Sequence, residues 1–387
     1  MNFEETDIQK DLRALARKFA DKELKPVVDE DENAERFRPE FIEKLGVLGL
    51  TGITSPEEQG GAGLGYQELS VVLEEIAKVC TSYAISIAVT GLPQIILNLF
   101  GNQQQKQKYI PPLAKGKAVG AFSLSEASSG SDAASLRTSA VKDGDYYVLN
   151  GTKLWCTQAD SAETFVIMAR TLSADVAPGP KGISSFLVEK GTAGLTFGKK
   201  ERKMGCHISH TMELILTDLR LHRSQLIGQE GNGFRVAMTA LDSGRITIAS
   251  IAVGVAQAAF EVALTHSKER KQFDHPLIDF QGISFMLADM AVGIESSRLL
   301  VQRAAWLKDS NRPFSMEAAM AKLYATDVAM KVTTDAVQIL GGSGYTQDFP
   351  VERWMREAKV LQIVEGTNQI QRLIIGRSLS IEGDVSP

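Results

Sequence analysis

Residues 146–155 of the chain read YYVLNGTKLW. Aromatic and β-branched residues lie on both sides of Asn150-Gly151, a pair that is typical of a two-residue turn between antiparallel strands. Further apolar runs of strand length follow at residues 165–168, 183–188 and 212–216. Short strands separated by turns predict a small antiparallel β-barrel or sandwich in the middle of the chain.

On both sides of this region, apolar residues recur at helical spacing. After a possible helix cap at Thr6, they occur at Leu12, Leu15, Ala16 and Phe19. This spacing predicts that the N-terminal part of the chain begins with an amphipathic helix.

Prolines mark two further boundaries in the N-terminal part. Pro39 is placed to begin a helix, because the first helical position needs no N–H donor. Pro111-Pro112 are expected to end the helical region, because neither residue can donate a backbone hydrogen bond.

The helical period returns near residue 233 in long segments that commonly pack as antiparallel bundles. These segments are residues 234–268, 280–306 and 316–339. The predicted fold class is therefore α+β, with three domains. They are an N-terminal helical domain (1–117), a middle antiparallel β-barrel or sandwich (118–232) and a C-terminal four-helix bundle (233–387).

The composition narrows the class of protein. The 387 residues carry a formal net charge of −5, so bulk attraction to nucleic acid or to an anionic membrane is not expected. The three cysteines cannot all pair and form no CxxC, which favours a reducing compartment. No secretory or transit signal is visible, and the apolar stretch 246–260 is too short and too polar to span a bilayer. We therefore expect a bacterial cytoplasmic protein, or one of the mitochondrial matrix after processing.

Two apparent motifs carry little weight. Residues 60–65 read GGAGLG, but no strand precedes them and the glycine spacing is wrong for a dinucleotide loop, so a plain turn is favoured. Cys206, His207 and His210 include metal-ligand types, but no fourth ligand lies nearby at a useful spacing, so no metal is expected. The histidines show no neighbourhood typical of a Ser/His/Asp triad.

Two glycine-containing segments leave alternatives open. Residues 121–132 (AFSLSEASSGSD) run from a strand into a loop of small hydroxyl residues, which suits close approach to a ligand and a serine-rich surface turn equally well. Residues 338–345 (QILGGSGY) end a long helix at paired glycines. A helix C-cap explains these glycines better than a close contact with a phosphate or a ring.

A third segment, residues 363–372 (IVEGTNQIQR), places Glu365 among apolar residues just before a predicted helix start, with Thr367 as a natural N-cap. Burial beside Ile363 and Val364 would raise the pKa of Glu365 and make it a stronger general base for a carbon acid. The alternative is a glutamate stabilised by the helix dipole, and this segment alone favours that alternative.

Together, in this order and spacing, the segments resemble the acyl-CoA dehydrogenase family, most closely its short- and medium-chain and short branched-chain members. The resemblance covers essentially the whole chain. It rests on residues 124–126 with 130–132, and on residues 150–155, 269–273, 338–342 and 365–367. It implies a helix–sheet–helix architecture, an FAD cofactor and α,β-dehydrogenation of an acyl-CoA thioester to the trans-2-enoyl-CoA.

The resemblance also implies roles for individual residues. Glu365 is similar to the base that removes the α-proton, while the β-hydrogen leaves as hydride to N5 of FAD. The amide of Glu365 and a flavin ribose hydroxyl would bind the thioester oxygen. The residues that resemble the FAD site are Phe122, Leu124, Ser125, Gly130, Ser131, Trp155, Thr157, Thr367 and Gln369. Those that resemble the part supplied by a neighbouring subunit are Arg270, Gln272, Phe273, Gln281, Gln338, Gly341 and Gly342. Substrate contacts are expected at Ser131, Asp242, Arg245, Val364 and Gly366.

The implied partners are an acyl-CoA substrate and an electron-transfer flavoprotein as electron acceptor, with no nucleic acid and no membrane. The implied assembly is a homotetramer built as a dimer of dimers. Residues 85–92 are expected to line the far end of the acyl cavity. They contain no arginine or lysine, so a dicarboxylate substrate would lack a counter-ion there.

The chain departs from the family pattern at positions that bear on the site. Cys156 replaces the usual aliphatic residue beside the flavin wall. Val364 stands where straight-chain members usually have tyrosine, which widens the cavity near the α-carbon and predicts tolerance for branched short acyl groups. In branched-chain relatives the base lies just before the Arg245 position; here that residue is Gly244, so Glu365 has no competitor.

Two competing functions remain at this stage. An acyl-CoA oxidase or another flavoenzyme on the same scaffold would give its electrons to oxygen, but such oxidases usually have a longer chain. A non-catalytic relative that binds nucleic acid would need a basic surface, whereas the net charge here is −5 and residues 382–387 include two carboxylates.

Overall fold

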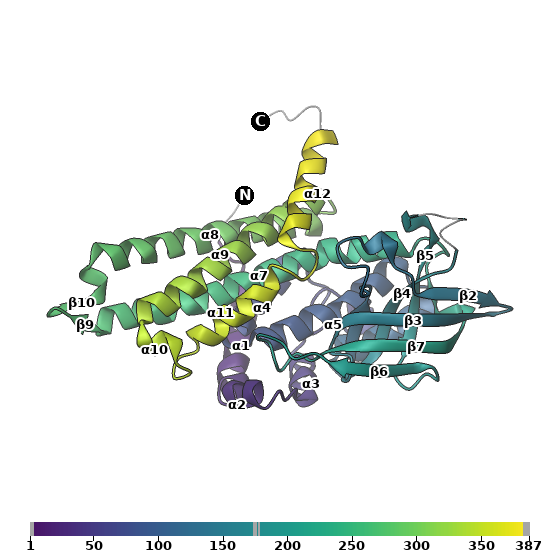
Figure 1. Ribbon diagram of the computed structural model, residues 1–387, viewed down its shortest axis with the longest axis horizontal. Helices are drawn as coiled ribbons and strands as arrows, with labels where there is room; N and C mark the ends of the chain where they lie inside the picture. The colour runs from purple at the N-terminus through teal and green to yellow at the C-terminus, as the bar shows by residue number, and fades with distance from the viewer. Residues whose placement is uncertain (1–3, 173–175, 177–178, 382–387) are drawn as a thin grey trace.

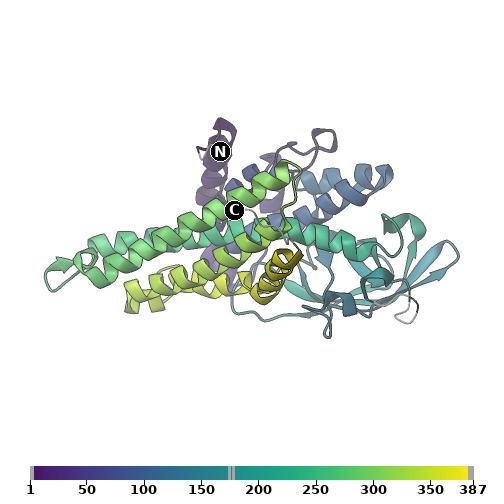
Figure 2. The ribbon, with the colours of Figure 1, turned by 90° about the horizontal axis from the view of Figure 1, so that it is seen from above.

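The computed structural model describes residues 4–172, 176 and 179–381. Long helices occupy one side of the molecule and a β-sheet the other, and α7 runs from the helical side to the sheet (Figure 1). The view from above shows the same division (Figure 2). Helices, strands and again helices follow one another along the chain, which confirms the predicted α+β class.

The N-terminal helices begin as the sequence predicts. Thr6 Oγ1 accepts a hydrogen bond from the amide of Gln9 at 3.2 Å, and the Gln9 side chain accepts one from the amide of Thr6 at 3.1 Å, which makes a capping box. Pro39 is the first residue of its helix. The elements are α1 (Asp7–Phe19), η1 (Ala20–Leu24), α2 (Val28–Asn33), α3 (Pro39–Val47), η2 (Glu57–Gln59), α4 (Tyr66–Val79), α5 (Thr81–Phe100) and α6 (Gln103–Ala114).

The expected helix end at Pro111-Pro112 is wrong. Both prolines lie inside the last turn of α6, which ends at Ala114. The fixed φ of proline suits a helix, and the carbonyls of Pro111 and Pro112 still accept hydrogen bonds from the amides of Lys115 and Lys117, at 3.1 and 2.9 Å. The missing N–H groups therefore weaken this turn without ending it.

The middle region forms one sheet with the strand order β6-β7-β3-β2-β4-β5-β8, and β1 pairs with β4. The β1–β4 and β2–β4 pairings are parallel, so the sheet is mixed, whereas a purely antiparallel one was expected. Its strands are β1 (Val119–Ser123), β2 (Ser139–Asp143), β3 (Tyr146–Thr157), β4 (Ala162–Arg170), β5 (Ile183–Glu189), β6 (Leu195–Lys200), β7 (Thr211–His222) and β8 (Leu226–Ile227). Short 3-10 turns lie at η3 (Ala133–Ser135), η4 (Gly179–Gly182) and η5 (Arg223–Gln225).

The predicted hairpin turn at Asn150-Gly151 is wrong, because β3 continues through both residues. The turn lies at Gly144, between β2 and β3, with a φ of 61°. At Gly151 the register with β7 shifts, and the Asn150 side chain accepts a hydrogen bond from the amide of Asp218 at 2.8 Å. A Cβ at Gly151 would lie 2.5 Å from Thr138 Oγ1, so a close approach requires this glycine.

The three long C-terminal helices are confirmed. α7, α8, α9 and α11 pack on one another, α4 and α5 also pack on α7, and α12 projects from the body (Figure 1). α9 ends at Gly341, whose φ is 61° and whose amide donates to Val337 O at 3.1 Å, as a C-cap requires. The elements are α7 (Gly233–Glu269), β9 (Lys271–Gln272), β10 (His275–Pro276), η6 (Leu277–Asp279), α8 (Gln281–Asp309), α9 (Ser315–Leu340), α10 (Gly342–Tyr345), α11 (Val351–Leu361) and α12 (Asn368–Ile381).

Two of these helices, α5 and α7, are long and apolar enough to cross a membrane by length and composition alone. Their most apolar windows are 61% and 78% buried inside the protein, as is typical of core helices. The stretch 246–260 is the buried centre of the longer helix, α7.

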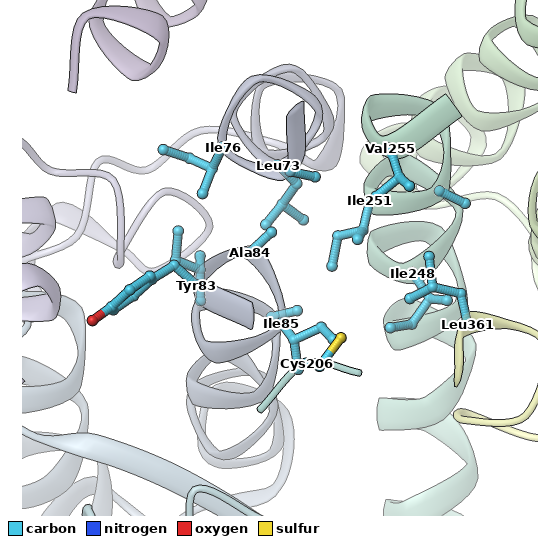
Figure 3. Packing of buried hydrophobic residues seen from close by; sticks show 14 of the residues in the cluster. Leu73, Ile76, Tyr83, Ala84, Ile85, Cys206, Ile248, Ile251, Val255 and Leu361 are labelled. Atoms are coloured by element: carbon cyan, nitrogen blue, oxygen red, sulfur yellow. The ribbon is translucent and has the colours of Figure 1, made fainter. Parts of the chain in front are cut away.

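The main core lies where α4, α5, α7 and α11 meet (Figure 3). Leu73, Tyr83 and Ile251 represent the three longer helices in this cluster, and Leu361 ends α11 within it. Cys206, in the segment before β7, packs against the same cluster (Figure 3). The turn that follows Leu361 is therefore anchored to the core at its start.

Candidate active site

Glu365 lies in the short turn between α11 and α12. Its φ is 55° and that of Gly366 is 89°, so two consecutive residues have left-handed backbone. Thr367 Oγ1 accepts a hydrogen bond from the amide of Ile370 at 3.3 Å, which confirms the predicted N-cap of α12. A non-glycine residue with positive φ is uncommon, so the surroundings must hold Glu365 in place.

The carboxylate of Glu365 rests against α7 at Gly244. A Cβ placed on Gly244 would lie 2.6 Å from Oε2 and 3.1 Å from Oε1 of Glu365. The carboxylate thus fills the space that a side chain would take at this point of the helix. Glycine at position 244 therefore makes room for the side chain of Glu365.

The electrostatic state of Glu365 is unusual for a carboxyl group. Its Oε2 atom is shielded from solvent and has no hydrogen-bond partner among the described residues. Burial raises the pKa of Glu365 to about 7, against the opposing attraction of Arg245 and Lys322. A carboxylate with this pKa is a far better base than an exposed glutamate, and about half of it is ionised at neutral pH.

The predicted substrate contacts Asp242 and Arg245 lie within one turn of Gly244 on α7. Arg245 forms an ion pair with Asp242, and its Nε lies 3.4 Å from the backbone oxygen of Glu365. Ser315 donates a hydrogen bond to Asp242 at 2.9 Å. Burial raises the pKa of Asp242, although Arg245 opposes the shift. The structure therefore brings Asp242, Arg245 and Glu365 together.

A small cavity of about 20 Å³ begins beside Gly244 and extends between α4, α5 and α7. Its wall includes Ile87, Ala88, Gly91 and Leu92, from the segment expected to line the far end of an acyl cavity. No charged side chain lines it, so it suits a short hydrocarbon chain. The other lining residues are Thr51, Ile53, Thr54, Tyr66, Leu69, Gln94, Ile95 and Thr247.

A larger cavity of about 440 Å³ lies elsewhere, between α1, α4, α7 and α8. Its three arginines are already paired: Arg13 binds Glu75, Arg298 binds Glu74 at 3.0 Å, and Arg303 binds Glu317 at 3.2 Å. No residue of the Glu365 turn lines it. Size alone therefore does not mark the reactive centre.

The hydroxyl-rich loop after β1 lies beside the end of β3. The amide of Leu154 donates to Ser125 O at 2.9 Å, and Lys153 Nζ donates to Leu124 O at 3.1 Å. Lys153, which is fully buried, also forms an ion pair with the largely buried Glu126 at 2.8 Å. Burial lowers the pKa of Lys153 to about 8 against the attraction of Glu126. This pair ties the loop to the strand.

Trp155 follows as part of a bulge in β3. Its φ is 61°, and the residue is 58% exposed although its strand has paired neighbours on both sides. Phe122 and Leu124 pack in one cluster with Ala240 and Leu241 of α7, about one turn before Gly244. The start of the hydroxyl-rich loop therefore packs on α7 about one turn before the point where the Glu365 carboxylate rests.

The second group of predicted cofactor residues lies far from Glu365 in the same chain. α7 rises ~1.5 Å per residue, so its end at Glu269 lies about 38 Å from Gly244. The group surrounds that end and the β9–β10 hairpin, at the opposite extreme of the molecule from the sheet (Figure 1). All of its members are exposed: Arg270, Gln272, Phe273, Gln281, Gln338, Gly341 and Gly342.

The remaining predicted residues have simpler positions. Gly130 and Ser131 are exposed in the loop after β1, and nothing lies within 4 Å of a Cβ built on Gly130. Thr157 ends β3, and Gln369 is exposed in the first turn of α12. Val364 packs against the main core.

The histidines near Cys206 are engaged in other interactions. The His207 ring lies 2.9 Å from Lys203 O, and the His210 ring lies 2.7 Å from Glu35 O. Cys206 itself is buried in the core. Among the described residues, no group of His, Cys, Asp and Glu side chains is arranged to hold a metal ion.

The sequence reasoning missed several side chains around the Glu365 turn, above all Lys322, Asn368 and Gln371. Lys322 is fully buried on α9 and donates to Gly366 O at 2.9 Å and to Asn368 Oδ1 at 2.8 Å. A signal was present, because Lys322 lies among alanines on the apolar face of the predicted helix 316–339. A lysine in that setting is either paired or functional.

Comparison with known proteins agrees with this arrangement along the whole chain. Residues 6–117, 121–219 and 231–380 match the sequence models for the N-terminal, middle and C-terminal domains of acyl-CoA dehydrogenases. The chain belongs to the acyl-CoA dehydrogenase family. It is therefore an oxidoreductase of a flavoprotein family, and its cofactor is FAD.

Individual relatives are similar over nearly their full length. A short-chain-specific acyl-CoA dehydrogenase from Clostridium acetobutylicum is 47% identical over 376 residues, which cover 97% of this chain and 98% of that protein. Butyryl-CoA dehydrogenase from Megasphaera elsdenii has a TM-score of 0.96 at 43% identity, covering 98% of this chain and all of its own. A chain in a structure of the electron transferring flavoprotein of Acidaminococcus fermentans has a TM-score of 0.95 at 46% identity, covering 98% and 99%.

The residues present fit a flat cofactor that carries phosphates. Trp155 offers an exposed aromatic face at a bulge, which a ring system can cover. The open space at Gly130 lets a ligand reach the backbone of the hydroxyl loop, and the N-terminus of α12 offers the positive end of its helix dipole to an anion. Leu124 of the same loop packs with Ala240 of α7, about one turn before Gly244, where a Cβ would meet the Glu365 carboxylate.

Proposed function

We propose that this acyl-CoA dehydrogenase oxidises a short-chain acyl-CoA to the trans-2-enoyl-CoA, with Glu365 as the base. The observation that carries the proposal is the shielded, unpartnered Oε2 of Glu365 on a carboxyl group whose pKa is raised to about 7. An unpartnered buried acceptor costs stability, so its retention in a strained turn favours a functional role. The small uncharged cavity beside Gly244 marks the direction in which the acyl chain would extend.

The chain's own residues perform the following steps. The Glu365 carboxylate takes one α-proton of the thioester and becomes the carboxylic acid, which its raised pKa favours. The amide N–H of Glu365 has no acceptor among the described residues and is available to the thioester oxygen as negative charge develops there. Bound FAD would supply the acceptor for the hydride that leaves the β-carbon. Arg245 and Asp242 form an ion pair on α7 next to the backbone of Glu365. The polar part of the substrate would contact this pair where it passes Gly366.

The cavity supports a short acyl chain as the substrate. Its volume of about 20 Å³ in the free protein holds little more than one water-sized group, so a long acyl chain would have to displace its walls. The relatives named for short-chain acyl-CoA point the same way. Val364, in place of a bulky aromatic residue, supports the further proposal that branched short acyl groups are accepted.

FAD is proposed to bind across two chains. Phe122, Leu124, Ser125, Trp155 and Thr157 would face the ring from the sheet side, Gly130 and Ser131 would contact its polar parts, and Thr367 with Gln369 would hold the phosphate and ribose end. Arg270, Gln272, Phe273, Gln281, Gln338, Gly341 and Gly342 would come from a second copy. The distance of about 38 Å along α7 supports this, because one chain cannot bring both groups to one cofactor. A homotetramer built as a dimer of dimers satisfies the requirement.

Electron-transfer flavoprotein is the proposed electron acceptor, supported by the similar chain in the Acidaminococcus fermentans structure. The cysteines Cys80, Cys156 and Cys206 are all free and buried, which supports a reducing compartment such as the bacterial cytoplasm or the mitochondrial matrix. The domain boundaries proposed from the sequence, 117/118 and 232/233, fall between α6 and β1 and between β8 and α7.

Anaerobic bleaching of the flavin by a panel of linear, branched, cyclic and aromatic acyl-CoA thioesters tests the proposal. Short linear and branched thioesters should bleach the wild type, whereas Glu365→Gln should stay yellow and unbleached. Bleaching of the Glu365→Gln protein at the wild-type rate would refute the assignment of the base. Rapid reoxidation of the reduced flavin by air would instead identify an oxidase.

A further inference from the structure

Lys322 is a fully buried lysine next to the reactive turn. Its neighbours on the buried face of α9 are Ala318, Ala319, Ala321 and Ala325, so the ammonium group loses nearly all of its hydration. Such a loss is tolerated only where acceptors replace the water. The acceptors are the carbonyl oxygen of Gly366 and Oδ1 of Asn368, at 2.9 and 2.8 Å.

A network of side chains extends these contacts across α9 and α12. Asn368 donates to Thr326 Oγ1 at 2.9 Å and to Asp327 Oδ1 at 2.7 Å. From α12, Gln371 Nε2 donates to Gly366 O at 2.8 Å and to Glu365 O at 3.2 Å. The two carbonyl groups of the turn are therefore held from both sides.

This turn needs such contacts, because its backbone is not in a preferred conformation. Glu365 has a φ of 55°, which an ordinary residue leaves readily unless neighbouring groups fix it. Relaxation of the turn would rotate the Cα–Cβ bond of Glu365 and move its carboxylate away from Gly244. The hydrogen bond from Lys322 to the Gly366 carbonyl, at 2.9 Å, acts on the residue next to Glu365.

We propose that Lys322 is a positioning residue for proton abstraction, because its ammonium group holds the Gly366 carbonyl and Asn368 and thereby fixes the turn that aims the Glu365 carboxylate. This inference rests on the proposed role of Glu365 as the base. Lys322 touches neither substrate nor cofactor in this account. It acts through the backbone of the turn and through its charge.

The charge of Lys322 adds a second effect that a purely structural tie would not have. Three charged groups face the Lys322 ammonium: Glu365 in the turn, Arg245 on α7 and Asp327 on α9. Arg245 and Lys322 are the two cations that favour the ionised form of Glu365, and Tyr66 on α4 also lies near it. Loss of the Lys322 charge must therefore raise the pKa of Glu365.

Lys322→Met tests the inference, since it keeps the length of the side chain and removes the ammonium group. We expect kcat to fall roughly 10- to 100-fold, because small misplacements of a reacting group have effects of that size. KM should change much less, the acid limb of the kcat profile should move to higher pH, and amide hydrogen exchange in the peptide 362–372 should accelerate. A variant with a lower Tm but unchanged kcat, acid limb and exchange would overturn the inference.

Two threonines on α9 provide a matched pair that also decides the case if Lys322→Met does not fold. Thr326 and Thr333 are both fully buried, and each donates to the carbonyl four residues earlier at 2.8 Å. Only Thr326 also contacts Asn368. Thr326→Val should lower kcat and accelerate exchange in the peptide 362–372, whereas Thr333→Val should do neither. Equal kcat values in the two variants would overturn the inference.

Failure of wild-type flavin to bleach with any acyl-CoA thioester would instead refute the proposed function itself.

Discussion

Gly244→Ala separates the position of the base from the stability of the fold. The added methyl group would lie 2.6 Å from Glu365 Oε2, whereas ordinary contacts begin near 3.4 Å, so the carboxylate oxygen must move by about 0.8 Å. The atoms in its way are the far end of a flexible side chain, and the carboxylate can swing aside at little cost to the fold. Alanine is also a better helix former than glycine.

A displacement of this size has a large effect on the reaction. Misplacing a reacting group by ~1 Å can slow a reaction ~100-fold, which corresponds to about 2.7 kcal/mol of additional barrier. We therefore expect Gly244→Ala to lower kcat with butanoyl-CoA by roughly two orders of magnitude while Tm and flavin content stay near the wild-type values. Steady-state kinetics with an artificial electron acceptor, differential scanning fluorimetry and the flavin absorbance per chain give these three quantities.

A second glycine provides the control. Gly376 on α12 is exposed, and nothing lies within 4 Å of a Cβ built there, so Gly376→Ala should leave kcat unchanged and preserve or slightly raise stability. If Gly244→Ala keeps the wild-type kcat, the carboxylate does not react from its place against α7. If Gly244→Ala instead loses flavin and has a much lower Tm, the Glu365 side chain did not move aside to relieve the contact with the added methyl group, and the reasoning is wrong.

Three further outcomes are expected. First, kcat should rise with pH through about 7, because Glu365 must lose its proton before it can act as the base; a profile that is flat between pH 5 and 8 by stopped-flow bleaching would contradict the raised pKa. Second, Glu126→Gln should lower the free energy of unfolding in urea by about 3–5 kcal/mol, because it leaves the Lys153 ammonium buried without its counter-charge. A change below about 1 kcal/mol would show that the Lys153–Glu126 pair does not hold the loop against β3. Third, Val364→Tyr should reduce kcat/KM for 2-methylbutanoyl-CoA more than for butanoyl-CoA; equal losses for both thioesters would show that residue 364 does not border the branch.

The sequence predicts those parts of the structure that local chemistry decides. The capping box at Thr6, the helix start at Pro39 and the C-cap at Gly341 each depend on residues within one turn of chain, and all three are confirmed. The turn at Glu365 was predictable for the same reason, because the next two residues, Gly366 and Thr367, form the turn and the N-cap of α12.

Features that depend on distant pairing could not be predicted. Asn150-Gly151 has the composition of a hairpin turn, but β7 pairs with both halves of β3, and the amide of Asp218 donates a hydrogen bond to the Asn150 side chain. The pair therefore becomes a bulge in a continuous strand. Pro111 and Pro112 stay helical because the last turn of α6 keeps their carbonyls bonded. At Asn150-Gly151 tertiary contacts outweigh the local preference, whereas at the two prolines backbone hydrogen bonds within the same segment keep the helix.

The candidate site shows the same limit. Glu365 can be singled out by its apolar neighbours, but nothing in the sequence places its carboxylate at Gly244, 121 positions earlier in the chain. The contact of Lys322 with Gly366 likewise needs α9 and α12 to meet. Arg270 and the other exposed cofactor candidates near the end of α7 show the opposite case. The sequence marks them as part of a cofactor site, but within one chain the end of α7 lies about 38 Å from Gly244. Their predicted role requires a second chain.

The most direct test of Glu365 as the base is anaerobic stopped-flow bleaching with butanoyl-CoA that carries either hydrogen or deuterium on its α-carbon. The wild type should bleach more slowly with the α-deuterated thioester, Glu365→Asp should bleach more slowly still and keep an isotope effect, and Glu365→Gln should not bleach. Bleaching of Glu365→Gln with the same rate and the same isotope effect as the wild type would show that another group removes the α-proton.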